Sequence, residues 1–237
     1  MQYQLWASTT TQEAVNSAFT SAMGRVYLWM TGGLGLTTVV ALAVANNPGI
    51  QQALFSSNLT VFGLIGAQFG LVVVISLAIN KMAPSVALGL FFLYAGLTGL
   101  TLSTVFLVYD LGTIGLAFGA AASLFAGLSL VGMTTRKDLT RLGPMLLASL
   151  LGLIVASVAN WFLQSTLLEW VVSLAGVIIF AGLTVYDSKK IKEMTSDAVL
   201  QGDTLVVQRV GIMGALKLYL DFLNLFMFIL RLAGGRK

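Results

Sequence analysis

Residues 218–226 read Leu-Tyr-Leu-Asp-Phe-Leu-Asn-Leu-Phe, so Asp221 stands inside a long apolar run near the end of the chain. A carboxylate within a membrane helix costs roughly 2.5–3.5 kcal/mol on insertion scales, and residues kept at that cost usually serve a function. A second acid, Asp187, closes the preceding apolar run and is followed by Ser188-Lys189-Lys190. These two carboxylates are the first candidates for a functional site.

The composition indicates a membrane protein. Of the 237 residues, 57% are hydrophobic and only 9% are charged, whereas soluble domains average about 25% charged residues. There is no cysteine or histidine, which excludes disulfides, thiol nucleophiles, serine–histidine catalysis and the usual zinc sites. We expect no cofactor. The formal charge of +4 is small, so nucleic acid is not expected as a partner.

Seven apolar runs are long enough to cross a bilayer, which takes about 17–25 residues. They predict an all-α membrane protein with seven transmembrane helices in a single domain over residues 25–237, preceded by a cytoplasmic tail at residues 1–24. The predicted spans are residues 26–45, 59–79, 86–109, 113–133, 145–163, 170–186 and 210–232. Small residues four apart, such as Gly66 and Gly70 or Gly115 and Gly119, predict close helix packing inside the bundle, and a dimer interface is the alternative.

Lysine and arginine alternate between loops. The loops at residues 46–58, 110–112 and 164–169 contain none, whereas the intervening connections are basic. The positive-inside rule therefore predicts a cytoplasmic N-terminus. The tail containing Arg231, Arg236 and Lys237 conflicts with a complete seventh crossing. Either the last helix crosses despite these charges, or it is re-entrant.

Lys217 lies one helical turn before Asp221. If Lys217 marks the cytoplasmic boundary, Asp221 lies one turn deeper and can face Asp187, and the two carboxylates then titrate as one unit. The simpler alternatives are a surface pairing of Asp187 with Lys190 or Lys192, and an i, i+4 salt bridge between Lys217 and Asp221.

Other polar residues could assist the pair. Tyr186, Tyr219 and Asn224 are candidates to modulate it through hydrogen bonds. On the third span, Tyr94, Thr98, Thr101 and Thr104 share one face and form a candidate ion path. The alternative for these threonines is a bond from each hydroxyl to a preceding carbonyl of the same helix.

Several of these segments resemble the Bax inhibitor-1 family, and the bacterial branch most closely. The resemblance is carried by residues 182–187 (Gly-Leu-Thr-Val-Tyr-Asp) and 218–226, and also by residues 93–109 and 134–139. It covers nearly the whole chain after Arg25. It implies two three-helix layers around a central C-terminal helix, and a pH-sensitive calcium leak gated by two aspartates that match Asp187 and Asp221. The resemblance to the family implies no role for Lys217.

Four functions fit these residues. The first is a leak channel for calcium or other cations, in which Asp187 and Asp221 also bind calcium transiently. The second is a non-conducting regulatory scaffold in the lipid bilayer that binds a membrane protease or secretion component. An intramembrane aspartyl protease is third, although the flanking residues differ from the presenilin-like signature. A retinal protein using Lys217 is the fourth. We expect a non-enzymatic, multi-pass protein of the bacterial inner membrane.

Overall fold

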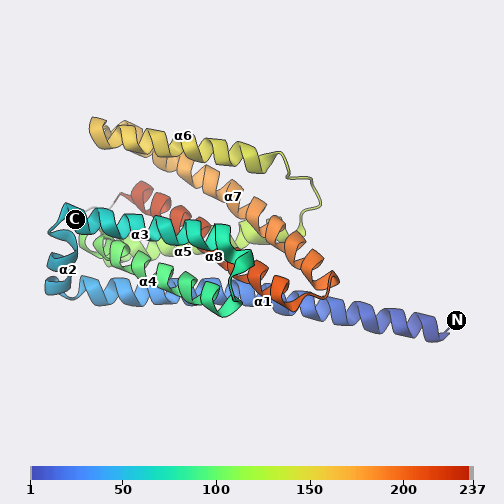
Figure 1. The fold of residues 1–237 in the computed structure, drawn as a ribbon. Coiled ribbons are helices and arrows are strands. Elements are labelled where there is room, and N and C mark those ends of the chain that lie inside the picture. The colour runs from blue at the N-terminus through green and yellow to red at the C-terminus, as the bar shows by residue number, and fades with distance from the viewer. Residues whose placement is uncertain (1, 235–237) are drawn as a thin grey trace. The chain divides into compact units, whose positions relative to one another are not determined.

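The computed structural model describes residues 2–234, and side-chain positions for Glu13 and from Val15 onward. Over that range the chain is almost entirely helical (Figure 1). The helices are α1 (Gln2–Ala45), α2 (Pro48–Phe55), α3 (Asn58–Ala78), the short 3-10 helix η1 (Ile79–Lys81), α4 (Pro84–Val108), α5 (Leu111–Thr134), α6 (Leu142–Leu163), α7 (Thr166–Leu200) and α8 (Thr204–Ala233).

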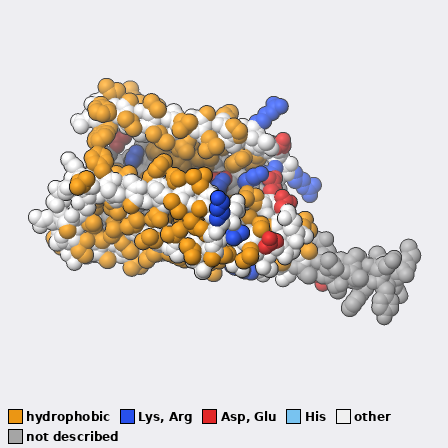
Figure 2. Space-filling view, viewed as in Figure 1, with side chains coloured by type: hydrophobic (Ala, Val, Ile, Leu, Met, Phe, Trp, Pro, Cys, Tyr) orange, Lys and Arg blue, Asp and Glu red, His pale blue; other side chains and the backbone are white. Residues whose placement is uncertain are grey.

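Seven of the described helices are long and apolar enough to span a membrane, which confirms the predicted fold class. They comprise α3 with η1, α1 from Val15 onward, and all of α4, α5, α6, α7 and α8. Apolar side chains cover most of the face seen in Figure 2, as expected for a surface that contacts lipid. The chain is therefore a multi-pass membrane protein.

The last helix is the most buried. In the most apolar 18-residue stretch of α8, 61% is buried inside the protein, against 39% or less in the corresponding stretches of the other six spans. This is the burial expected of a central helix, while the two three-helix layers remain a prediction. Helix α8 has 30 residues without interruption, about 45 Å at 1.5 Å per residue, which exceeds the roughly 30 Å hydrocarbon core. A complete crossing is favoured over a re-entrant helix.

Several helices extend beyond the predicted spans. Helix α1 begins at Gln2, inside the predicted tail, and α7 continues past Asp187 to Leu200. The segment after Asp187 contains Lys189, Lys190, Lys192 and Glu193, and lysine and glutamate favour helix as strongly as most apolar residues do. Hydropathy marks where an apolar run ends, but the helix itself continues. Asp187 therefore lies just beyond the predicted sixth span but within the helix α7.

The chain forms two compact units. The first contains residues 1–40, 47–101 and 190–216. Within it, the Thr37 hydroxyl lies 2.9 Å from the carbonyl oxygens of both Gly33 and Ala95, which links α1 to α4. Gly99 on α4 makes this contact close, because a Cβ there would lie 2.7 Å from the Thr37 carbonyl oxygen. Hydrogen bonds at 3.2 and 3.0 Å from Arg209 to the Met82 carbonyl tie α8 to the segment before α4.

The second unit contains residues 41–46, 102–189 and 217–237. Figure 1 shows α6 and α7 as an antiparallel pair. Helix α5 packs on α7, where the hydroxyls of Ser129 and Ser188 lie 3.0 Å apart. It also packs on α8 through edge-to-face contacts of Phe222 with Phe118 and Phe125.

The glycines with regular four-residue spacing do not form the close contacts. A Cβ at Gly66, Gly70, Gly115 or Gly119 would meet nothing within 4 Å among the described residues, so the prediction of close packing there is wrong. The close approach in the second unit occurs instead at Gly132. A Cβ on Gly132 of α5 would collide with the Val185 carbonyl oxygen of α7.

We therefore expect Gly132→Ala to destabilise the protein by about 1–3 kcal/mol, the usual cost of overpacking. Gly127→Ala on the same helix is the matched control, because its Cβ would enter open space and alanine is the better helix former by about 1 kcal/mol. Thermal unfolding in detergent would compare the two variants with the parent chain. Equal midpoints for the two variants would contradict the close contact.

Candidate functional site

A cavity of about 470 Å³ in the second unit contains both candidate carboxylates. Asp187 from α7 and Asp221 from α8 line it together with Lys217 and Asn224. The rest of its wall is mostly apolar and comes from α6, α7 and α8, with Leu147, Leu150, Leu153, Ile154, Ser157, Val158, Phe180, Leu183, Leu220 and Phe228. The structure therefore brings together two acids that are separated by a loop and two helix segments. We call this space the carboxylate cavity.

Lys217 forms an ion pair with Asp187, not with Asp221. Its Nζ donates to Asp187 Oδ1 at 2.9 Å, which links α8 to α7. The Asp187 side chain is 11% exposed and the Lys217 side chain 42% exposed. The aliphatic stem of a lysine can lie along apolar helix surface while its ammonium group reaches a polar partner. The sequence also allowed a salt bridge between Lys217 and Asp221 on the same helix, but the structure pairs Lys217 with Asp187 instead.

Asp221 is the more deeply buried acid, with 4% of the residue exposed. Its Oδ2 is buried without a hydrogen-bond partner within the described part of the chain. A buried polar atom that lacks a partner costs about 1–3 kcal/mol, and more when it is charged. A proton or a bound cation would relieve this cost. The carboxylate cavity thus combines one paired carboxylate with one whose oxygen lacks a partner.

The three candidate modulators have different positions. Asn224 lines the carboxylate cavity, and its Nδ2 donates to the Leu220 carbonyl at 2.8 Å. Tyr186 packs its ring over Gly143 of α6, where a Cβ would lie 2.5 Å from the ring. Tyr219 is fully buried. Neither tyrosine lines the cavity in the described structure.

The candidate ion path on α4 is not part of this cavity. Tyr94, Thr98 and Thr101 belong to the first unit and Thr104 to the second, and none of the four is among the described residues that line the cavity. The Thr98 hydroxyl donates to the Tyr94 carbonyl and the Thr101 hydroxyl to the Thr98 carbonyl, both at 2.9 Å. Two of the three threonines therefore make the local bonds of the simpler alternative.

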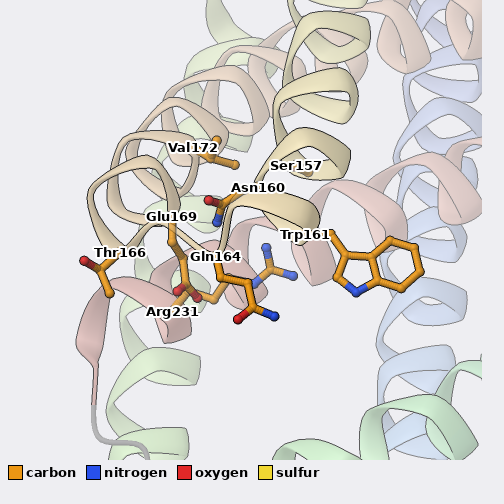
Figure 3. Close-up of a pocket in the computed structure, with 8 residues that line it drawn as sticks. All are labelled: Ser157, Asn160, Trp161, Gln164, Thr166, Glu169, Val172 and Arg231. Carbon is orange, nitrogen blue, oxygen red and sulfur yellow. The ribbon is translucent and has the colours of Figure 1, made fainter.

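A second cavity, of about 530 Å³, lies at the end of the second unit where α6 meets α7. Figure 3 shows Asn160, Gln164 and Glu169 gathered with Arg231 around it. The sequence did not reveal this site, because residues 164–169 are predicted to form a loop and Arg231 conflicts with the predicted topology. A clue in the sequence was the pair Glu169 and Arg231. These opposite charges lie at the predicted outer ends of the sixth and seventh spans. We call this space the polar cavity.

The turn between α6 and α7 is built by side-chain caps. Gln164 has φ 48°, a left-handed conformation that ends α6. The Asn160 side chain then accepts a bond from the Ser165 backbone N–H at 3.1 Å. Ser165 caps α7 by accepting from the Leu168 N–H at 3.3 Å, as serine commonly does before a helix. This turn holds Asn160 and Glu169 at one cavity.

No preformed metal centre is visible in the described chain, since three or more Asp, Glu, His or Cys side chains nowhere come together there. Calcium in stable protein sites takes six to eight oxygen ligands. The two cavity carboxylates and the Asn224 amide would provide only part of such a shell. These residues therefore fit brief contact with a cation better than storage of one.

Sequence comparison decides the family. The family described as "Inhibitor of apoptosis-promoting Bax1" matches residues 20–237, which include every helix that contributes to the two cavities. The chain belongs to the Bax inhibitor-1 family. Its relatives include inner membrane protein YbhL of Escherichia coli (strain K12), which is 45% identical over 215 residues, 91% of this chain and 92% of the relative.

Other bacterial relatives are similar over comparable lengths. A protein of Borreliella burgdorferi is 43% identical over 215 residues, covering 91% of this chain and 92% of its own length. A protein of Rickettsia prowazekii is 36% identical over 238 residues, 98% of each chain. The resemblance noted in the sequence is thus confirmed at the level of the family.

Proposed function

We propose that this Bax inhibitor-1 family protein is a pH-sensitive cation leak channel of the bacterial inner membrane, with calcium as its main ion and Asp187, Asp221 and Lys217 as its gate. The observation that carries this proposal is the ion pair between Lys217 and Asp187 beside a buried Asp221 oxygen without a partner. It joins α7 to α8 through one charge-assisted bond inside a membrane-spanning segment. One proton on Asp187 would turn this ion pair into a weaker hydrogen bond.

Protonation is the proposed opening step. With Asp187 ionised, its bond to Lys217 holds α7 and α8 together at the carboxylate cavity. A proton on the carboxylate removes the attraction between opposite charges, which weakens the link between the helices. We expect acidification to loosen the gate and to increase the leak.

The residues support a cation as the conducted ion. Two acids and an amide line the carboxylate cavity, and hard cations such as calcium bind to oxygen ligands. Weak and incomplete coordination lets an ion enter and leave, as conduction requires. The pairing with Lys217 also speaks against an aspartyl protease, in which two adjacent carboxylates share one proton.

Reconstitution into liposomes tests conduction directly. The purified protein would be placed in vesicles that contain a calcium-sensitive dye, with calcium outside and the pH set between 5 and 8. We expect dye signal above that of protein-free vesicles, increasing as the pH falls. If protein-containing and protein-free vesicles behave alike at every pH, the channel proposal is wrong and a non-conducting scaffold is the better account.

A further inference from the structure

We propose that the polar cavity is a water-filled vestibule that leads to the carboxylate cavity, and that Phe228 forms the constriction between them. This inference rests on the proposed function and adds the route by which a cation reaches the carboxylates from the opposite membrane face. It replaces the candidate path on α4.

The two cavities share a wall. Ser157 of α6 lines both of them. The polar cavity contains Glu169 near the start of α7 and Arg231 near the end of α8, while the carboxylate cavity contains Asp187 and Lys217 on the same two helices. From Glu169 to Asp187 the helix rises about 27 Å at 1.5 Å per residue. Together the cavities therefore follow most of the roughly 30 Å apolar thickness of a bilayer.

Phe228 lies where the two cavities meet. Its ring lines the carboxylate cavity and stacks on Phe180 with ring centroids 5.8 Å apart. The Arg231 guanidinium, which belongs to the polar cavity, lies 5.4 Å from the centroid of the same ring. On α7, Gly176 leaves the space for this ring, because a Cβ there would lie 2.6 Å from it. The ring is thus wedged between α7 and α8 and separates the cavities.

The chemistry of the polar cavity indicates water rather than lipid. Glu169 lies in the first turn of α7 and Arg231 in the last turn of α8, and charged side chains near the ends of membrane helices turn toward water or toward each other. Both side chains line this cavity together with Asn160 and Gln164, as Figure 3 shows. Glu169 would attract cations at the mouth. Arg231, next to the constriction, would repel them and keep the leak small.

The absence of cysteine from the natural chain allows a direct accessibility test. Ser157→Cys and Val172→Cys place a thiol in the polar cavity, and Val155→Cys places one at nearly the depth of Ser157 on the exposed face of α6. Thr166→Cys, at the mouth, identifies the membrane face from which the cavity opens. Intact spheroplasts and inverted vesicles would be treated separately with a charged, membrane-impermeant methanethiosulfonate reagent.

We expect Ser157→Cys and Val172→Cys to react from the same face as Thr166→Cys. Their reaction should be faster than that of Val155→Cys by on the order of tenfold or more, because the reactive thiolate forms only where water solvates it. If both cavity variants react no faster than Val155→Cys, the proposal of a water-filled vestibule is wrong. Ser157→Cys is nearly isosteric, and Val172→Cys serves as a second position should the first fail to fold.

Leak measurements test whether the vestibule lies on the route. Labelling of Ser157→Cys should reduce the calcium leak several-fold, and Phe228→Ala should increase it several-fold by widening the constriction. A leak that neither change alters would refute the route. A parent chain that shows no leak at all would refute the proposed function, while the labelling rates would still decide whether the vestibule contains water.

Discussion

Asp187→Asn and Asp221→Asn are each expected to remove or shift the pH dependence of the calcium leak. Asparagine keeps the size of the side chain but carries no titrating proton. It also deprives Lys217 of its anionic partner when placed at residue 187. The measurement is calcium flux into liposomes as a function of pH for both single variants. Asp197→Asn, at an exposed position on the same helix α7, is the control and should retain the profile of the parent chain.

The double variant distinguishes a coupled pair from two independent acids. Residues that act as one unit deviate from additivity by about 0.5–3 kcal/mol, whereas distant sites add within about 0.3–0.5 kcal/mol. We expect the combined effect on leak to differ clearly from the sum of the single effects. Additive effects, or an unchanged profile in either single variant, would show that the two carboxylates do not act together.

Lys217→Met is expected to raise the pH at which the leak changes. Methionine preserves the apolar stem and removes the cation that lies 2.9 Å from Asp187 Oδ1. A nearby cation favours the ionised form of a carboxylate, so without it the proton binds at a higher pH.

Lys217→Arg is the matched control, because it keeps the positive charge at the same position. Its midpoint should lie close to that of the parent chain. If the Lys217→Met midpoint remains in place or moves to lower pH, Lys217 only anchors the helix at the membrane boundary, and the ion pair has no part in gating.

The membrane spans could be predicted because hydropathy depends on local sequence alone. The same signal could not show that α7 continues to Leu200, because lysine and glutamate end an apolar run without ending a helix. Close packing at Gly132 also escaped prediction. The spacing of small residues shows where two helices can approach closely, but it does not show whether a second helix lies there. At Gly66 and Gly70 an added Cβ would have no neighbour within 4 Å.

The carboxylate cavity was partly accessible to sequence reasoning. Placing Lys217 at a boundary brings Asp221 and Asp187 to similar depths, and both acids line one cavity. The partner of Lys217 could not be foreseen, because the choice between a residue on its own helix and one on α7 depends on how the two helices are rotated. The wall from α6 and the Phe228 constriction depend on the same tertiary packing. The local sequence pattern predicts neither the α6 wall nor the position of Phe228.

The most direct test is infrared titration of the carboxyl groups in the reconstituted protein, recorded under the same conditions as its calcium flux. The protonated carboxyl band reports how many of the nine acids carry a proton at each pH, and the Asp187→Asn and Asp221→Asn variants identify the part that comes from the carboxylate cavity. We predict a protonation step in the parent chain whose midpoint coincides with that of the flux and which both Asp→Asn variants lose or shift. A flux that changes with pH while this band remains constant would contradict gating by the Asp187–Asp221 pair.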